Sequence, residues 1–140
     1  MPTERTQRRL SKVAKPVDKR LYKNYLQKSE EMLDVARYAA NTSKNNAAVA
    51  SSVHCAINAI DAPAVFYFGR RPAGGHEEAL DAIRGAFDEN EFRDMAKQFS
   101  GLIGLKNEAE YQPDLMKGSQ AGDALRRASR ILSKVRQKLP

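Results

Sequence analysis

Residues 47–68 form a segment of 22 residues that has no Lys or Arg and only one acid, Asp61. The whole chain, by contrast, is 29% charged. A helix with so little charge needs protein around most of its circumference. It is too polar to span a bilayer, where every polar side chain needs a partner inside hydrocarbon. Five side chains have that need: Ser51, Ser52, His54, Asn58 and Asp61. The segment is therefore predicted to be the central helix of a soluble, all-α bundle.

Polar side chains follow one line along this predicted helix. His54, Asn58 and Asp61 stand at positions i, i+4 and i+7, and Ser51 stands one turn earlier, so all four share a face. An apolar line runs beside it: Val49, Val53, Ile57, Ile60 and Ala64. Either neighbouring helices satisfy the polar line, or the line faces a ligand-binding or catalytic cleft. In the second case His54 is a candidate catalytic residue.

Size and composition set further bounds. A chain of 140 residues fits one domain that is large enough to bury a core. Its single cysteine, Cys55, excludes an internal disulfide and is expected to be an inert core thiol. The sequence has no metal-spaced ligand set, phosphate loop or serine elbow, so we expect no metal and no cofactor. No signal peptide or membrane span is apparent, so we expect a cytoplasmic protein without membrane contact.

The net charge of +7 is concentrated near the start of the chain. Residues 1–24 carry two acids and eight bases: Arg5, Arg8, Arg9, Lys12, Lys15, Lys19, Arg20 and Lys23. We interpret residues 1–16 as a flexible basic arm and residues 17–140 as a single helical domain. Together with Arg70 and Arg71, bases of this region are candidates for binding the phosphates of RNA or DNA. A solvated tail, or an arm that clasps another subunit, is an equally weighted interpretation.

Hydrophobic periodicity predicts the remaining elements. A first helix is expected over residues 17–40, and a third begins at His76, where acids favour a helix start. A fourth helix follows Asp88 and reaches Tyr111, before Pro113 stops it. The last helix is expected over residues 120–139. No alternating run is long enough to predict a strand.

Motifs on four of these helices resemble the HEPN family. They are residues 54–62 (HCAINAIDA), 76–79 (HEEA), 106–111 (KNEAEY) and the helix that contains Asp123, Ala124 and Ala128. Their order and spacing cover about residues 18–139 and leave the basic arm outside. The resemblance implies a four- or five-helix up-and-down bundle that forms a homodimer. It also implies a partner of the nucleotidyltransferase type or a place in a toxin–antitoxin system.

Many HEPN proteins are metal-independent ribonucleases with an Arg, four to six residues and a His on the fourth helix. This chain has Lys106 and Tyr111 at those places, and neither replaces its counterpart: Lys lacks the bidentate fork of Arg, and Tyr is no acid/base near neutral pH. The resemblance therefore favours a non-catalytic binding module. We expect its groove to be lined by His54, Asn58, Asp61, Lys106, Glu110 and Tyr111.

A ribonuclease is the alternative interpretation. Arg71 and His76 also satisfy the Arg-X4-His pattern, but they lie in the connection after the central helix. In a ribonuclease, His54 or His76 would supply acid/base chemistry, while Arg70, Arg71 or Lys106 would steady the phosphate charge.

Overall fold

The computed structural model describes Thr3 and residues 14–72 and 75–140. Within them lie four long helices and a short one: α2 (Tyr22–Asn41), α3 (Asn45–Phe68), α4 (His76–Ile83), α5 (Glu89–Tyr111) and α6 (Gly118–Lys138). Single 3-10 turns, η1 (Lys19–Leu21) and η2 (Arg84–Ala86), precede α2 and follow α4. The remaining elements are two short strands, β1 (Ala14–Pro16) and β2 (Arg70–Pro72).

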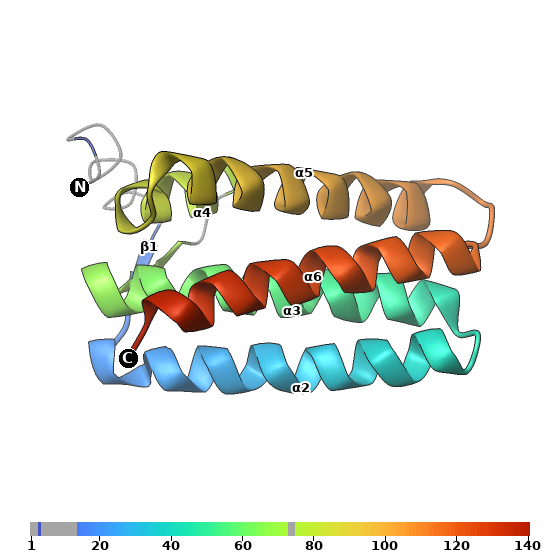
Figure 1. Ribbon diagram of the computed structural model, residues 1–140, viewed down its shortest axis with the longest axis horizontal. Helices are drawn as coiled ribbons and strands as arrows, with labels where there is room; N and C mark the ends of the chain where they lie inside the picture. Colours follow the sequence, from blue (N-terminus) through green and yellow to red (C-terminus); the bar gives the residue numbers. More distant parts are fainter. Residues whose placement is uncertain (1–2, 4–13, 73–74) are drawn as a thin grey trace.

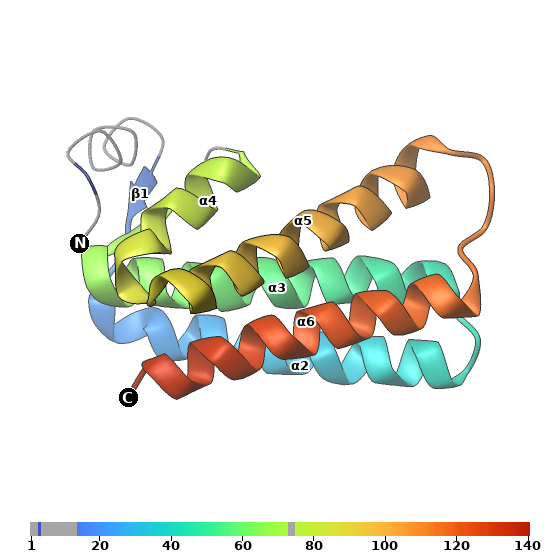
Figure 2. The same cartoon turned by 45° about the horizontal axis from the view of Figure 1, so that its top comes forward.

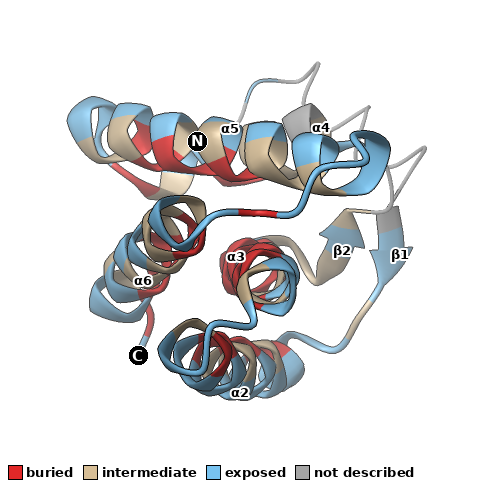
Figure 3. Cartoon of the chain, turned by 90° about the vertical axis from the view of Figure 1, so that its right-hand side faces the viewer, coloured by how far each residue is buried: buried red, intermediate tan, exposed pale blue. Residues whose placement is uncertain are grey.

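The four long helices lie side by side and alternate in direction along the chain (Figure 1). Viewed from one end, α3 occupies the middle, with α2, α5 and α6 around it (Figure 3). The short α4 packs near the end of the bundle where α3 finishes (Figure 1). Towards its C-terminus, α5 inclines away from α3 (Figure 2). The prediction of an all-α, up-and-down bundle is therefore confirmed.

Burial on α3 follows the predicted pattern. Val49, Val53, Ile60 and Ala64 are buried and Ile57 is half-buried, as expected for a line that faces neighbouring helices. Among the described residues, α3 is also the helix that is long and apolar enough to cross a membrane, but 67% of its apolar window is buried inside the bundle. Its neighbours contribute the large core side chains Met95, Phe99, Leu102, Ile131 and Leu132.

Gly69 determines how the chain leaves α3. It adopts a left-handed conformation with φ of 64°, which glycine adopts without a Cβ penalty, and its N–H donates to the carbonyl of Val65 at 2.8 Å. The side chain of Lys19 lies so close that a Cβ on Gly69 would be 3.4 Å from it. This turn sends the chain directly into β2.

The expectation of no strands is wrong at two three-residue segments. β1 and β2 pair antiparallel, with Ala14 opposite Pro72, Lys15 opposite Arg71 and Pro16 opposite Arg70. The backbone N–H of Val17 extends the pairing by donating to the carbonyl of Gly69 at 2.8 Å. Segments this short cannot display an alternating pattern, and they pair because η1 and the end of α3 bring them together. Residues 14–16, assigned to the arm from sequence, are thus paired with the helical domain.

Candidate functional site

The β1–β2 ribbon brings together basic residues that are distant in sequence. Residues directly opposite in an antiparallel pair project from the same face, so the side chains of Lys15 and Arg71 are neighbours there. Arg70 lies opposite Pro16, and Lys19 packs over the adjoining Gly69. Lys28 on α2 completes the group, because its charge acts on the same carboxylate that binds Arg71. We call these residues the basic cluster: Lys15, Lys19, Lys28, Arg70 and Arg71.

Asp61 anchors this cluster to the core. Its side chain is 4% exposed, and its Oδ2 accepts a hydrogen bond from Nε of Arg71 at 3.1 Å. The Arg71 side chain is 48% exposed, so the pair runs from the interior to the surface. Asp61 therefore ties β2 to α3 through one charged contact.

The protonation of Asp61 reflects its position. Burial raises its pKa, whereas the charge of Arg71, the hydrogen bond from Arg71 and the charge of Lys28 lower it. Burial is the largest of these effects, and the pKa rises from 3.8 to about 6. The carboxyl is therefore mainly ionised at neutral pH and faces two cations.

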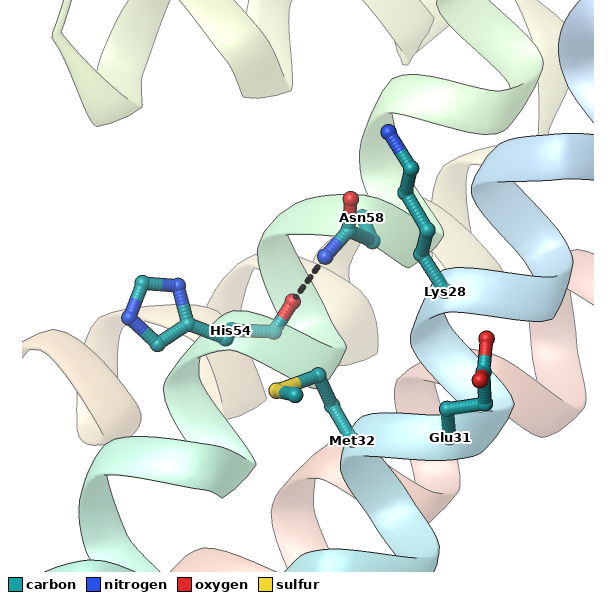
Figure 4. Close-up of a pocket in the computed structure, with 5 residues that line it drawn as sticks. All are labelled: Lys28, Glu31, Met32, His54 and Asn58. Atoms are coloured by element: carbon teal, nitrogen blue, oxygen red, sulfur yellow. Dashed lines mark hydrogen bonds between the residues drawn. The ribbon is translucent and has the colours of Figure 1, made fainter.

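An open pocket of about 440 Å³ lies between α2 and α3. Its lining residues are Lys28, Glu31 and Met32 from α2 with His54 and Asn58 from α3 (Figure 4). The pocket thus contains two residues of the predicted polar line. The other two, Ser51 and Asp61, lie outside this lining, and Asp61 is turned to Arg71 instead.

His54 occupies the pocket without an orienting partner. The amide nitrogen of Asn58 donates to the backbone carbonyl of His54 at 2.9 Å, and the imidazole points away from Lys28 and Glu31 (Figure 4). Among the described residues, no side chain makes a hydrogen bond to the imidazole. An acid/base catalyst needs a group that fixes its geometry. The imidazole therefore lacks, among the described residues, a side-chain contact that would orient it for acid/base catalysis.

The predicted groove residues on α5 form a separate arrangement. Nζ of Lys106 lies 3.1 Å from Oε2 of Glu110, a pair one helical turn apart. Tyr111 is 75% exposed at the end of the helix. None of the three lines the pocket between α2 and α3.

Part of the predicted site falls on residues that the structure does not describe. Arg5, Arg8, Arg9 and Lys12 lie outside the described residues, and so does the side chain of His76, although its backbone begins α4. Arg20 is described, and its guanidinium binds the carboxylate of Asp18 with an Nη2 to Oδ2 distance of 2.7 Å. Arg20 therefore has its charge partly matched.

Other reactive groups are few in the described part of the chain. Cys55 is buried and burial raises the pKa of its thiol; its Sγ lies 3.3 Å from Oγ of Ser29. This is the setting of a core thiol, not of a nucleophile. In the same part of the chain, no three His, Cys, Asp or Glu residues are grouped closely enough to hold a metal ion.

Sequence reasoning missed two features of the site. One is Lys28, which falls in an ordinary helical pattern and carries no motif. The other is the contact between Asp61 and Arg71, although a signal for it was present. A lone acid in an otherwise uncharged helix needs a buried partner, and the nearest following cations are Arg70 and Arg71.

Comparison with known proteins adds no assignment. The sequence matches no protein-family model and no curated protein.

Proposed function

We propose that this protein is a HEPN-type helical bundle that acts as a non-catalytic binding module and binds RNA at the basic cluster. One observation carries the proposal: the strand register, which places Lys15 opposite Arg71 and Arg70 opposite Pro16. Two basic segments from different parts of the chain thereby form one surface. Lysine and arginine side chains gathered in this way bind phosphates by releasing counterions, whatever the base sequence.

The pairing of charges supports this location. The four arginines of α6 are matched by acids: Arg126 and Arg127 contact Asp123, Arg130 contacts Asp94 and Arg136 contacts Glu30. In the basic cluster, Lys15, Lys19, Lys28 and Arg70 form no ion pair with any described residue. The β1–β2 ribbon and α6 lie on opposite sides of α3 (Figure 3). Four of the cations that lack an ion pair to a described residue are therefore grouped in the basic cluster.

The HEPN assignment is supported by the placement of the motifs on successive helices. Residues 54–62 lie within α3, residues 76–79 begin α4, residues 106–111 end α5 and Asp123 to Ala128 lie in α6.

With the HEPN assignment we propose a cytoplasmic homodimer that has a partner of the nucleotidyltransferase type, as in a toxin–antitoxin system. Ile103 and Leu105 of α5 pack against the core but are only half-buried, so part of their apolar surface is open to a second copy. Light scattering after size exclusion measures the dimer directly.

The RNA-binding proposal is tested with two double variants that remove the same charge. Fluorescence anisotropy with a short labelled single-stranded RNA would compare Lys15→Gln/Arg70→Gln with Arg126→Gln/Arg130→Gln. We expect the ribbon variant to bind roughly tenfold more weakly than wild type and the α6 variant to change little. Equal losses in the two variants, or no binding by the wild type, would contradict the proposal.

A metal-independent ribonuclease is the second candidate, because His54 and Lys28 share one pocket. A cation and a histidine in one pocket can support phosphate cleavage if the imidazole turns toward the bound phosphate. Incubation of the protein with single-stranded RNA in the absence of metal distinguishes the two candidates. RNA that remains intact supports the binding module, whereas cleavage lost in His54→Ala or His76→Ala establishes the enzyme.

A further inference from the structure

One of the three guanidinium nitrogens of Arg71, Nε, holds this side chain in place. Its Nε donates to Oδ2 of Asp61 at 3.1 Å. Its two terminal nitrogens donate no hydrogen bond to any residue in the described ranges 14–72 and 75–140. Because the side chain is 48% exposed, a ligand can reach it. Arg71 thus combines a fixed end in the core with an accessible end at the surface.

This arrangement is suited to phosphate. A guanidinium is a rigid planar fork, so a bond at Nε restricts the orientation of the whole group. The two terminal nitrogens together match two oxygens of a phosphate in bidentate geometry. A carboxylate that holds Nε therefore orders the fork before a ligand arrives, which lowers the entropy lost on binding.

The surroundings favour an anion at this place. Lys15 projects from the same face of the ribbon as Arg71, and Lys28 is close enough to act electrostatically on Asp61. Two cations, Arg71 and Lys28, thus act on one buried carboxylate, and Lys15 lies beside Arg71 on the ribbon. A phosphate at the terminal nitrogens of Arg71 would be attracted by the positive charges of Lys15 and Lys28, which form no ion pair with a described residue.

We propose that Asp61 is the positioning residue of a phosphate-binding site in which Arg71 and Lys15 bind one phosphodiester of RNA. The proposal rests on the proposed function and names the residues that carry it. Asp61 acts only through Arg71, which it holds by Nε. It does not touch the RNA.

Charge alone predicts the opposite effect of removing Asp61. A carboxylate near a phosphate site repels the ligand, so its neutralisation should strengthen binding. If the carboxylate positions Arg71, its loss releases the guanidinium and weakens binding. The sign of the change therefore distinguishes positioning from simple electrostatics.

The experiment measures RNA affinity by anisotropy for wild type, Asp61→Asn and a control, Asp18→Asn. Asp18 also binds an arginine, but this pair lies at the surface, with the Arg20 side chain 89% exposed. We expect Asp61→Asn to bind roughly tenfold more weakly and Asp18→Asn to bind as tightly as wild type or slightly more tightly. Unchanged or tighter binding by Asp61→Asn overturns the proposal.

A second pair of variants keeps the test independent of the folding of Asp61→Asn. Arg71→Lys keeps the charge and removes the fork, whereas Arg70→Lys makes the same change at a neighbour that has no carboxylate partner. We expect a loss only in Arg71→Lys, and no additional loss when Asp61→Asn is combined with it. Equal effects at the two arginines, or independent losses in the double variant, also overturn the proposal.

Failure of the proposed function has a different signature. If wild type binds no RNA, titration with inorganic phosphate can still be followed through the NMR signals of the arginine side-chain N–H groups. Arg71 signals that move in wild type but not in Asp61→Asn support the positioning role without RNA binding. Arg71 signals that respond equally in both proteins, or in neither, overturn it.

Discussion

Nε of Arg71 lies 3.1 Å from Oδ2 of Asp61 and thereby joins the ribbon to the central helix. The carboxylate belongs to the least charged helix of the chain, and the guanidinium belongs to its basic cluster. The contact therefore links what stabilises the fold to what we propose binds RNA. Its two side chains should respond differently to mutation and to pH.

Removing the guanidinium should destabilise the fold. Arg71→Ala leaves Asp61 buried without its partner, a change that costs roughly 3–5 kcal/mol for a fully buried pair. Because the Arg71 side chain is 48% exposed and water screens it, we expect a loss of roughly 1–2 kcal/mol. Urea unfolding at neutral pH measures the free energy, with Arg70→Ala as the control. Equal stability of the two variants would show that the contact contributes nothing.

Asp61 should also make stability depend on pH. Its pKa is about 6 in the folded protein against an ordinary 3.8, so the folded state holds the proton more tightly than the unfolded state. The bound proton on Asp61 therefore stabilises the folded state. This contribution is complete below about pH 4 and is lost as the pH rises through about 6. A shift of this size corresponds to up to about 3 kcal/mol.

The measurement is the difference in unfolding free energy between Asp61→Asn and wild type at about pH 4.5 and about pH 7. Asp18, beside Arg20, and Asp88, which caps α5, titrate below this range because hydrogen bonds lower their pKa, and both are present in the variant as in wild type. Their effects cancel in the difference. The unfolding free energy of Asp61→Asn should increase relative to that of wild type as the pH rises. A difference that stays constant would contradict the raised pKa.

The two glycines inside α5 should behave differently when replaced by alanine. A Cβ on Gly101 would overlap Nη1 of Arg127, whereas a Cβ on Gly104 would meet nothing within 4 Å. Gly104→Ala should therefore stabilise the protein by about 0.5–1 kcal/mol through helix propensity. In Gly101→Ala, Arg127 must move from its contacts with Lys97 and Gln98, which offsets that gain.

Thermal and urea unfolding of the two variants would test this contrast. We expect Gly101→Ala to be less stable than Gly104→Ala by about 1–2 kcal/mol. The same stabilisation in both variants would mean that Arg127 moves aside without loss.

Aromatic residues of α5 provide a further contrast between core and surface. Phe99 is 1% exposed in the core, and its replacement by alanine should cost about 3–5 kcal/mol because it leaves a cavity. Tyr111 is 75% exposed, so Tyr111→Ala should change the stability by no more than about 0.5 kcal/mol. Chemical denaturation compares the two. A large loss in Tyr111→Ala would show that this residue is covered, for example by a second subunit.

The helices could be predicted from sequence because their apolar residues recur at helical spacing. Val49, Val53 and Ile60 identified the buried face of α3, and Asp88 marked the start of α5, where it caps the helix with Glu91. The local sequence pattern was sufficient for these helices, because each of them buries one continuous line of apolar residues.

The ribbon could not be predicted in the same way. Its register pairs Lys15 with Arg71, residues far apart in sequence, through strands of three residues that contain prolines. Tertiary packing brings these segments together, and no local periodicity encodes such a pairing. The same pairing holds Arg71 in β2 next to Asp61. Asp61 therefore binds Arg71, whereas His54, on the same predicted polar line, lines the pocket.

The salt dependence of RNA affinity tests the central claim most directly. Each phosphate contact with a single strand adds about 0.7 to the slope of log affinity against log salt concentration. For Lys15→Gln/Arg70→Gln/Arg71→Gln we predict a slope smaller than that of wild type by roughly 1 to 2, with circular dichroism confirming the fold. An unchanged slope would show that RNA does not bind at the ribbon and would contradict the account.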